Sequence, residues 1–136
     1  MNKKIVLIQD NEDILNLMDD VLQEEGFKVT ASLTTEPIEQ IKKIEPDLLV
    51  VDDNLPGTKK GSEVISDLKS DPDTEEVSSV LTSTASNLAD ISKACKADDF
   101  IEKPFDLDHM IHIVRKNCWV ITATWFAYWV VLYCVF

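Results

Sequence analysis

The chain has 136 residues, which is the size of one domain and leaves little room for a second. It carries 25 acidic and 13 basic side chains, and this net charge of -12 repels phosphate backbones and argues against nucleic-acid binding. A content of 45% hydrophobic and 28% charged residues is typical of a globular protein and excludes disorder. The three cysteines lack metal-site spacing and the N-terminus lacks a signal-peptide pattern, so we expect a cytoplasmic location.

The first half of the chain alternates short apolar runs with helical periodicity. Residues 5–8 are continuously apolar, which predicts a strand. Intervals of three and four then predict one buried helix face, formed by Ile14, Leu17, Met18, Val21 and Leu22. Gly26 ends this helix, and a second strand over 27–32 precedes a second helix around residues 38–41. Residues 48–51 are apolar throughout, as in a strand of a parallel sheet that is buried on both faces.

The second half continues the alternation, with strands predicted at 77–82 and 99–102 and a last helix capped by Asp106. The inward residues of its three helices are Val64, Ile65 and Leu68; Leu88, Ile91 and Cys95; and Met110, Ile111, Ile113 and Val114. Five strand–helix repeats predict an open parallel α/β sheet with helices on both faces. Ligand chemistry is then expected at the carboxyl ends of the strands.

Polar side chains follow four of the five predicted strands. They are Asp10 after the first strand, Asp52 after the third, Ser83 after the fourth and Lys103 after the fifth. Two carboxylates and a backbone carbonyl supply the oxygen ligands that Mg²⁺ prefers. A lysine and a hydroxyl suit the oxygens of a phosphoryl group. The pattern predicts phosphoryl transfer, with Asp52 as the nucleophile.

Three sequence blocks in this order resemble the receiver domains of two-component response regulators. They are residues 3–14 (KKIVLIQDNEDI), residues 46–52 (PDLLVVD) with LPG at 55–57, and residues 97–105 (ADDFIEKPF). The resemblance covers residues 3–117. It implies a flavodoxin-like, doubly wound sheet of five parallel strands in the order 2-1-3-4-5 with five helices, and a cis peptide bond between Lys103 and Pro104.

By this resemblance, Asp52 accepts a phosphoryl group from a histidine kinase or a phosphotransfer protein. The implied magnesium ligands are Asp10, Asp52 and the backbone carbonyl of Asn54. Lys103 and Ser83 would contact the phosphoryl group, with Thr84 as a further candidate. Ser83 and Phe100 would form the switch. The switch changes a protein-interaction surface for a downstream effector. The chain is then no enzyme, apart from its own Mg²⁺-dependent phosphorylation and dephosphorylation.

Two features depart from the family pattern. Gln9 stands where the family usually has the first of two acidic residues, so Mg²⁺ is expected to bind more weakly, although the amide oxygen can still hold a water. The loop over 57–61 is one residue longer than usual. One alternative is therefore a pseudo-receiver that binds proteins without being phosphorylated. Another, a flavodoxin-like enzyme with a phosphorylated cofactor, is disfavoured because no glycine-rich phosphate loop is present.

Residues 118–136 contain no Lys, Arg, Asp or Glu, so the sequence divides into a predicted domain over 1–117 and a hydrophobic tail. As a helix the tail would nearly span the ~30 Å of a bilayer core, and Arg115 and Lys116 precede it as on a cytoplasmic flank. Three interpretations stay open. The tail is a membrane anchor that tethers the domain, a non-native sequence, or a segment that packs against protein, as in a homodimer.

Overall fold

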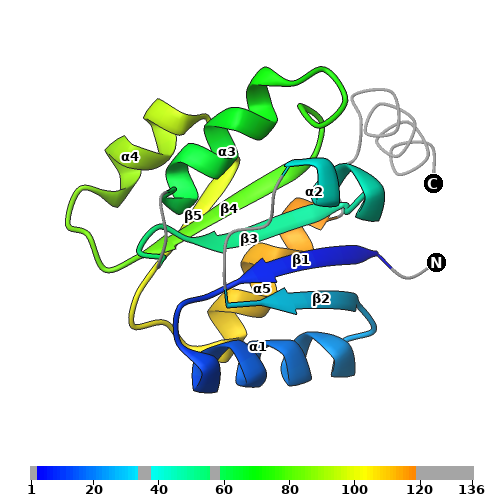
Figure 1. Cartoon of the computed structure of the whole chain (residues 1–136). Helices are drawn as coiled ribbons and strands as arrows, with labels where there is room; N and C mark the ends of the chain where they lie inside the picture. Colours follow the sequence, from blue (N-terminus) through cyan, green and yellow to red (C-terminus); the bar gives the residue numbers. More distant parts are fainter. Residues whose placement is uncertain (1–2, 34–37, 56–58, 119–136) are drawn as a thin grey trace, which may run out of the picture.

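The computed structural model describes residues 3–33, 38–55 and 59–118. Five parallel strands form one sheet in the order β2-β1-β3-β4-β5 (Figure 1). The strands are β1 (Lys4–Ile8), β2 (Lys28–Ser32), β3 (Leu48–Asp52), β4 (Ser78–Ser83) and β5 (Asp99–Glu102). The helices that follow them in turn are α1 (Glu12–Glu24), α2 (Ile38–Ile44), α3 (Gly61–Ser70), α4 (Leu88–Cys95) and α5 (Leu107–Cys118). The predicted flavodoxin-like fold and strand order are confirmed.

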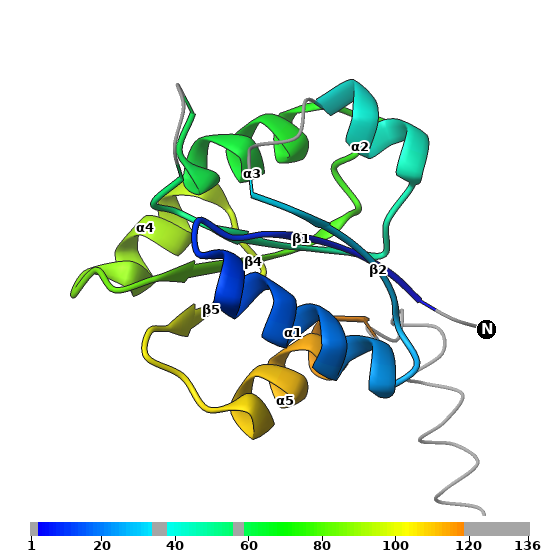
Figure 2. The same ribbon diagram turned by 60° about the horizontal axis from the view of Figure 1, so that its bottom comes forward.

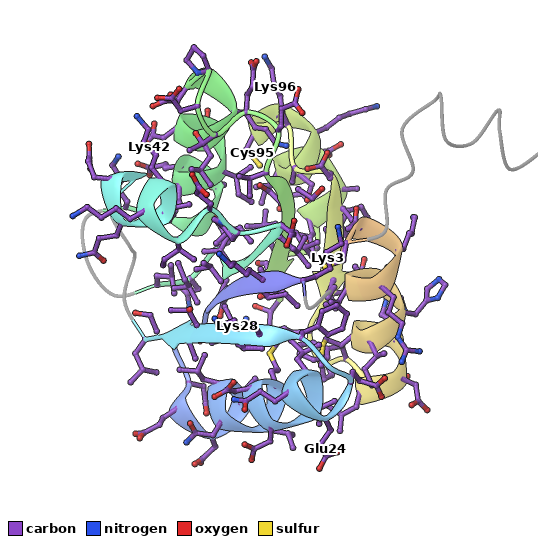
Figure 3. The ribbon with its side chains drawn as sticks, turned by 90° about the vertical axis from the view of Figure 1, so that its right-hand side faces the viewer. Lys3, Glu24, Lys28, Lys42, Cys95 and Lys96 are labelled. Carbon is purple, nitrogen blue, oxygen red and sulfur yellow. The ribbon has the colours of Figure 1, made fainter. Side chains whose placement is uncertain are left out.

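The helices cover both faces of the sheet, with α1 and α5 on one face and α2, α3 and α4 on the other (Figure 2). Successive strand residues point to opposite faces, which divides the core in two. The core under α1 and α5 takes Leu7, Val50 and Val80, and the core under the other three helices takes Ile8, Val51 and Leu81. Figure 3, seen from the end of the sheet where Lys3 and Lys28 lie, shows side chains filling both layers. Burial on both faces explains why β1 and β3 read as continuous apolar runs.

One predicted core residue, in α1, is exposed in the structure. In α1 the buried residues are Leu15, Met18 and Leu22, whereas the predicted core residue Leu17 is 50% exposed. In α4 Leu88 and Cys95 are buried as predicted, together with Ser92, and the partly buried Ile91 packs against the same core. α1 carries apolar residues over more than one face, and the packing of the neighbouring elements decides which side is covered. The predicted face of α3 is confirmed.

Helix and strand ends follow local hydrogen bonding. β4 spans Ser78–Ser83, one residue later than predicted, because the Val77 amide donates to the Thr74 carbonyl in the preceding turn and the Ser83 carbonyl accepts the Lys103 amide. Asp106 caps α5 as predicted, since its Oδ1 accepts the backbone amide of His109 at 2.6 Å. Gly26 adopts a positive φ of 95°, which suits the residue after a helix. The Lys103–Pro104 peptide bond is cis, as the family resemblance implied.

The edge strand β5 is held at its beginning by two neighbouring aspartates. Asp98 Oδ2 accepts both the Lys69 ammonium of α3 and the Ser79 amide of β4, each at 2.8 Å. Asp99 Oδ2 accepts the side chains of Lys116 and Asn117 of α5, each at 3.2 Å. The start of β5 is therefore tied to both helical layers.

The tail predicted over 118–136 lies outside the described residues except for Cys118, which ends α5. Its interpretations as an anchor, a non-native sequence or a homodimer contact remain predictions. Within the part of the chain that the structure describes, no helix combines the length and the apolar character needed to cross a bilayer.

Candidate functional site

The carboxyl ends of β1, β3, β4 and β5 meet at one edge of the sheet, at the left of Figure 1. Asp52 ends β3 and Ser83 ends β4, while Asp10 and Lys103 follow β1 and β5 closely in the sequence. The register pairs Asp52 with Thr82, the residue before Ser83. The four polar residues predicted from the sequence thus come from strands that are neighbours in the sheet.

Asp52 is buried, and its carboxylate has partners on both oxygens. Oδ2 contacts the Lys103 ammonium, and Oδ1 accepts the backbone amide of Asn54 at 3.3 Å. Lys103 Nζ also lies 3.7 Å from Asp10 Oδ1, so one lysine bridges both carboxylates. The pKa of Asp52 is raised to about 6, chiefly by burial and also by the Asp10 carboxyl, although Lys103 and the Asn54 amide oppose the rise.

The end of β4 is linked to the same lysine through the backbone. The amide of Lys103 donates to the Ser83 carbonyl at 2.9 Å, and Ser83 Oγ accepts the amide of Ala85 at 3.0 Å. Ser83 is buried, whereas the adjacent Thr84 is exposed. Phe100, which the register pairs with Leu81, is partly buried against the core under α3 and α4. The two switch candidates therefore lie on adjacent strands.

The donor atoms at this edge fit a hard divalent cation. Asp10 and Asp52 offer carboxylate oxygens on either side of Lys103, and the Asn54 carbonyl follows two residues after Asp52. Among the described residues no cluster of three or more His, Cys, Asp or Glu side chains forms a metal site. A cation here would keep several waters, which is the usual behaviour of Mg²⁺.

Gly61 and Asp53 fix α3 against the site and were not predicted to do so. Asp53 Oδ1 accepts the amide of Ser62 at 3.0 Å, and the Asp53 carbonyl accepts the amide of Gly61 at 3.3 Å. A Cβ on Gly61 would stand 2.3 Å from the Asp52 carbonyl oxygen. The glycine is therefore required by the close approach of α3 to Asp52. The sequence signal for this close approach was a glycine directly before a residue pattern that is typical of a helix.

Gln9 does not face the solvent, contrary to the expectation that its amide oxygen can hold a water of the metal site. Its side chain is 0% exposed, and Nε2 donates to Thr82 Oγ1 at 3.0 Å. Its Oε1 is buried and has no hydrogen-bond partner among the described residues. The amide is instead turned into the protein, beside Asp52.

A family model described as the response regulator receiver domain matches residues 5–115. The chain belongs to this receiver family. Sporulation initiation phosphotransferase F of Bacillus subtilis is 30% identical to this receiver over 120 residues, which is 85% of this chain and 94% of the relative. The phosphate regulon transcriptional regulatory protein PhoB of Rhizobium meliloti is 30% identical over 118 residues, or 85% of this chain. The receiver spans 52% of the length of PhoB.

A solved protein structure from Chloroflexus aurantiacus has the same fold. The TM-score is 0.80 at 21% identity, and the match covers 87% of this receiver and 98% of that chain. Receiver domains are signalling modules of two-component systems rather than classical enzymes, and their partners are kinases and effector proteins. The receiver identified from the sequence blocks is thus confirmed as a member of the family.

Proposed function

We propose that this receiver accepts a phosphoryl group on Asp52 from a histidine kinase or a phosphotransfer protein. The observation that carries the proposal is the buried Asp52 carboxylate, held between the Lys103 ammonium and the Asn54 amide with Asp10 nearby. A fixed carboxylate acts as the nucleophile, and a fixed cation stabilises the charge that develops on phosphoryl oxygens. The proposal includes a cytoplasmic location for the domain.

In the transfer, an Asp52 oxygen attacks phosphorus while the bond from phosphorus to the donor nitrogen breaks and its electron pair leaves with the donor. Lys103 moves its charge from the carboxylate towards the phosphoryl oxygens. The Ser83 hydroxyl donates to another of these oxygens, with the exposed Thr84 as a further candidate. Asp10, Asp52 and the Asn54 carbonyl would hold Mg²⁺, which neutralises phosphoryl charge when bound.

The proposed output runs through the end of β5. When Ser83 turns to the phosphoryl group, the partly buried Phe100 gains room to move inward. Phe100 borders a surface cavity of about 290 Å³ that Phe105 and His109 also line. Inward movement of the ring would reshape this cavity, so the surface around β5 and α5 would bind its effector differently in the two states.

The test is a mass measurement on the full chain, treated with acetyl phosphate and millimolar Mg²⁺. We expect a gain of one phosphoryl group that is lost in Asp52→Asn. Asp53→Asn is the matched control, since it alters the adjacent carboxylate and keeps an oxygen for the Ser62 amide. A wild-type chain that gains no phosphoryl group contradicts the proposal and leaves a receiver fold that acts as an unphosphorylated protein-binding module.

A further inference from the structure

The hydrogen bond between Gln9 and Thr82 crosses a strand. Gln9 follows β1 and Thr82 lies on β4, and the sheet order places β3 between these strands. Strands two positions apart are separated by about 10 Å, so this contact requires a long side chain. The Gln9 amide spans the gap and donates to Thr82 Oγ1 at 3.0 Å. We call this pair the strap.

The strap passes beside Asp52. Asp52 is registered with Thr82, and Ile8 is registered with Val51, so the next residue, Gln9, comes level with Asp52. Strand side chains alternate between faces. The residues two positions earlier, Leu7, Val50 and Val80, all lie in the core under α1 and α5. Gln9, Asp52 and Thr82 therefore form a row on the same face, with Asp52 in the middle.

The strap joins the two halves of the site. Gln9 directly precedes Asp10, and Thr82 directly precedes Ser83. Both strap side chains are 0% exposed, so water does not compete for their hydrogen bond. A fixed distance between Gln9 and Thr82 therefore also fixes the distance between Asp10 and Ser83, which lie on either side of Asp52.

Stability alone does not account for the strap. The Oε1 atom of Gln9 is buried without a partner among the described residues, which is unfavourable. Replacing both members of a buried hydrogen bond by apolar groups of similar shape is often nearly neutral. An apolar pair at these positions would therefore serve the fold about as well.

We propose that Gln9 and Thr82 are positioning residues that hold Asp10 and Ser83 at a fixed separation across Asp52, and so set the rate at which Asp52 is phosphorylated. This inference rests on the proposed function. It predicts a variant with near wild-type stability and impaired phosphoryl transfer.

The experiment uses the full chain with Thr82→Val, Thr82→Ser and the double variant Gln9→Met with Thr82→Val. The matched control is Thr74→Val, because the buried Thr74 hydroxyl donates to the Leu68 carbonyl at 2.8 Å in the α3–β4 connection, at the opposite end of the sheet. One readout is the rate of phosphorylation by acetyl phosphate at saturating Mg²⁺. The other is hydrogen exchange of the Lys103 and Ala85 amides, which donate to Ser83, in the unphosphorylated protein.

We expect Thr82→Val and the double variant to lower the phosphorylation rate roughly tenfold and to speed exchange of both amides. Thr82→Ser should restore both properties, and Thr74→Val should change neither. The urea midpoint of the double variant should equal that of the wild type. The positioning role of the strap would be overturned if Thr82→Val and the double variant were phosphorylated at the wild-type rate and exchanged both amides at the wild-type rate.

Failure of the proposed function is recognised separately. If the wild-type chain takes up no phosphoryl group, the proposed function fails. Amide exchange alone then tests whether the strap has a positioning role. Faster exchange at Lys103 and Ala85 in Thr82→Val, but not in Thr74→Val, then supports the positioning role. Equal exchange in both variants rejects it.

Discussion

Asp52 combines burial with a cationic neighbour, and these two influences act on its charge in opposite directions. The pKa of Asp52 is raised to about 6, because the effect of burial outweighs that of the Lys103 ammonium. The carboxylate is ionised at neutral pH, as a nucleophile requires, but its charged form is less favourable in the folded protein than in water. The site therefore lowers the stability of the protein in exchange for a reactive carboxylate.

Removing the Asp52 charge should stabilise the protein at neutral pH. Between an ordinary value of 3.8 and about 6, folded Asp52 holds a proton that the unfolded chain has lost, so its contribution to stability falls as pH rises through this window. In metal-free buffer near pH 7.5, we expect Asp52→Asn to raise the free energy of unfolding by about 1–3 kcal/mol. The gain should vanish towards pH 4, as measured by urea unfolding at several pH values.

The exposed Asp90 of α4 provides the control, since Asp90→Asn should leave the unfolding free energy almost unchanged over the same range. A lower stability of Asp52→Asn near pH 7.5 would mean that the attraction of Lys103 outweighs burial.

At the residue scale, the sequence predicted which side chains meet at the edge of the sheet, but it did not predict the orientation of the Gln9 side chain. Asp10, Asp52, Ser83 and Lys103 follow from the rule that parallel strands end at one edge. Gln9 at the same edge was expected to remain near the metal site. Its hydrogen bond to Thr82 depends on β3 lying between two strands far apart in sequence, which local pattern does not reveal.

At the scale of elements, α3 begins against the end of β3, and this contact fixes the backbone beneath the reactive carboxylate. Gly61 is the first residue of α3, and its amide donates to the Asp53 carbonyl. The atoms nearest to a methyl group added at Gly61 would be the backbone carbonyl oxygen and carbon of Asp52, which cannot rotate away. Any side chain at position 61 must therefore displace the strand end or the helix.

Gly61→Ala should destabilise the protein and slow phosphorylation together. The added Cβ would lie 2.3 Å from the Asp52 carbonyl oxygen and 2.8 Å from its carbon. We expect a loss of about 1–3 kcal/mol in unfolding free energy, as for other overpacked sites, measured by urea unfolding. A parallel mass assay should show slower phosphorylation of Asp52.

Gly26→Ala separates backbone strain from this steric clash. Gly26 has a φ of 95° and nothing within 4 Å of an added Cβ, so its variant should lose stability without slower phosphorylation. Slowing of equal size in both variants would show that general loss of stability, and not displacement of Asp52, limits the transfer.

Element types were predictable because apolar runs and helical spacing alternate cleanly, whereas burial at the edges of helix faces was not. Apolar residues in α1 occupy positions on both sides of its buried stripe. Leu15 is buried and Leu17 is half exposed because of where β2 and α5 cover the helix. The one-residue shift of β4 likewise depends on neighbouring segments, since the Val77 amide bonds to the preceding turn and the Ser83 carbonyl to the Lys103 amide.

On the scale of the whole molecule, the net charge of -12 means that divalent cations can stabilise the protein in two ways. They screen the overall negative charge, and they can bind to the site at Asp10 and Asp52. Mg²⁺ bound only to the folded site should raise the unfolding free energy, by about 1.4 kcal/mol at tenfold the dissociation constant. Urea unfolding across a Mg²⁺ titration measures this gain, which Asp10→Asn should reduce.

Sodium chloride at matched ionic strength is the control, because screening of the overall acidic charge also stabilises the protein. If Mg²⁺ stabilises the wild type and Asp10→Asn to the same extent, Asp10 takes no part in binding.

The layered architecture was predictable from the repeated strand–helix pattern, and the order of the strands came from the family resemblance. Periodicity alone does not determine which strand lies beside which, since helices of similar length permit several orders. The blocks around Asp10, Asp52 and Lys103 resolved this because they identified the family.

The paired aspartates at the start of β5 have a mechanical consequence. Asp98 and Asp99 anchor the strand to α3, β4 and α5 at one end, and Lys103 lies just beyond the other end. We expect a displacement of Lys103 to be absorbed at the carboxyl end of β5, while the backbone of Phe100, next to the anchored Asp99, stays in place and its ring moves by side-chain rotation.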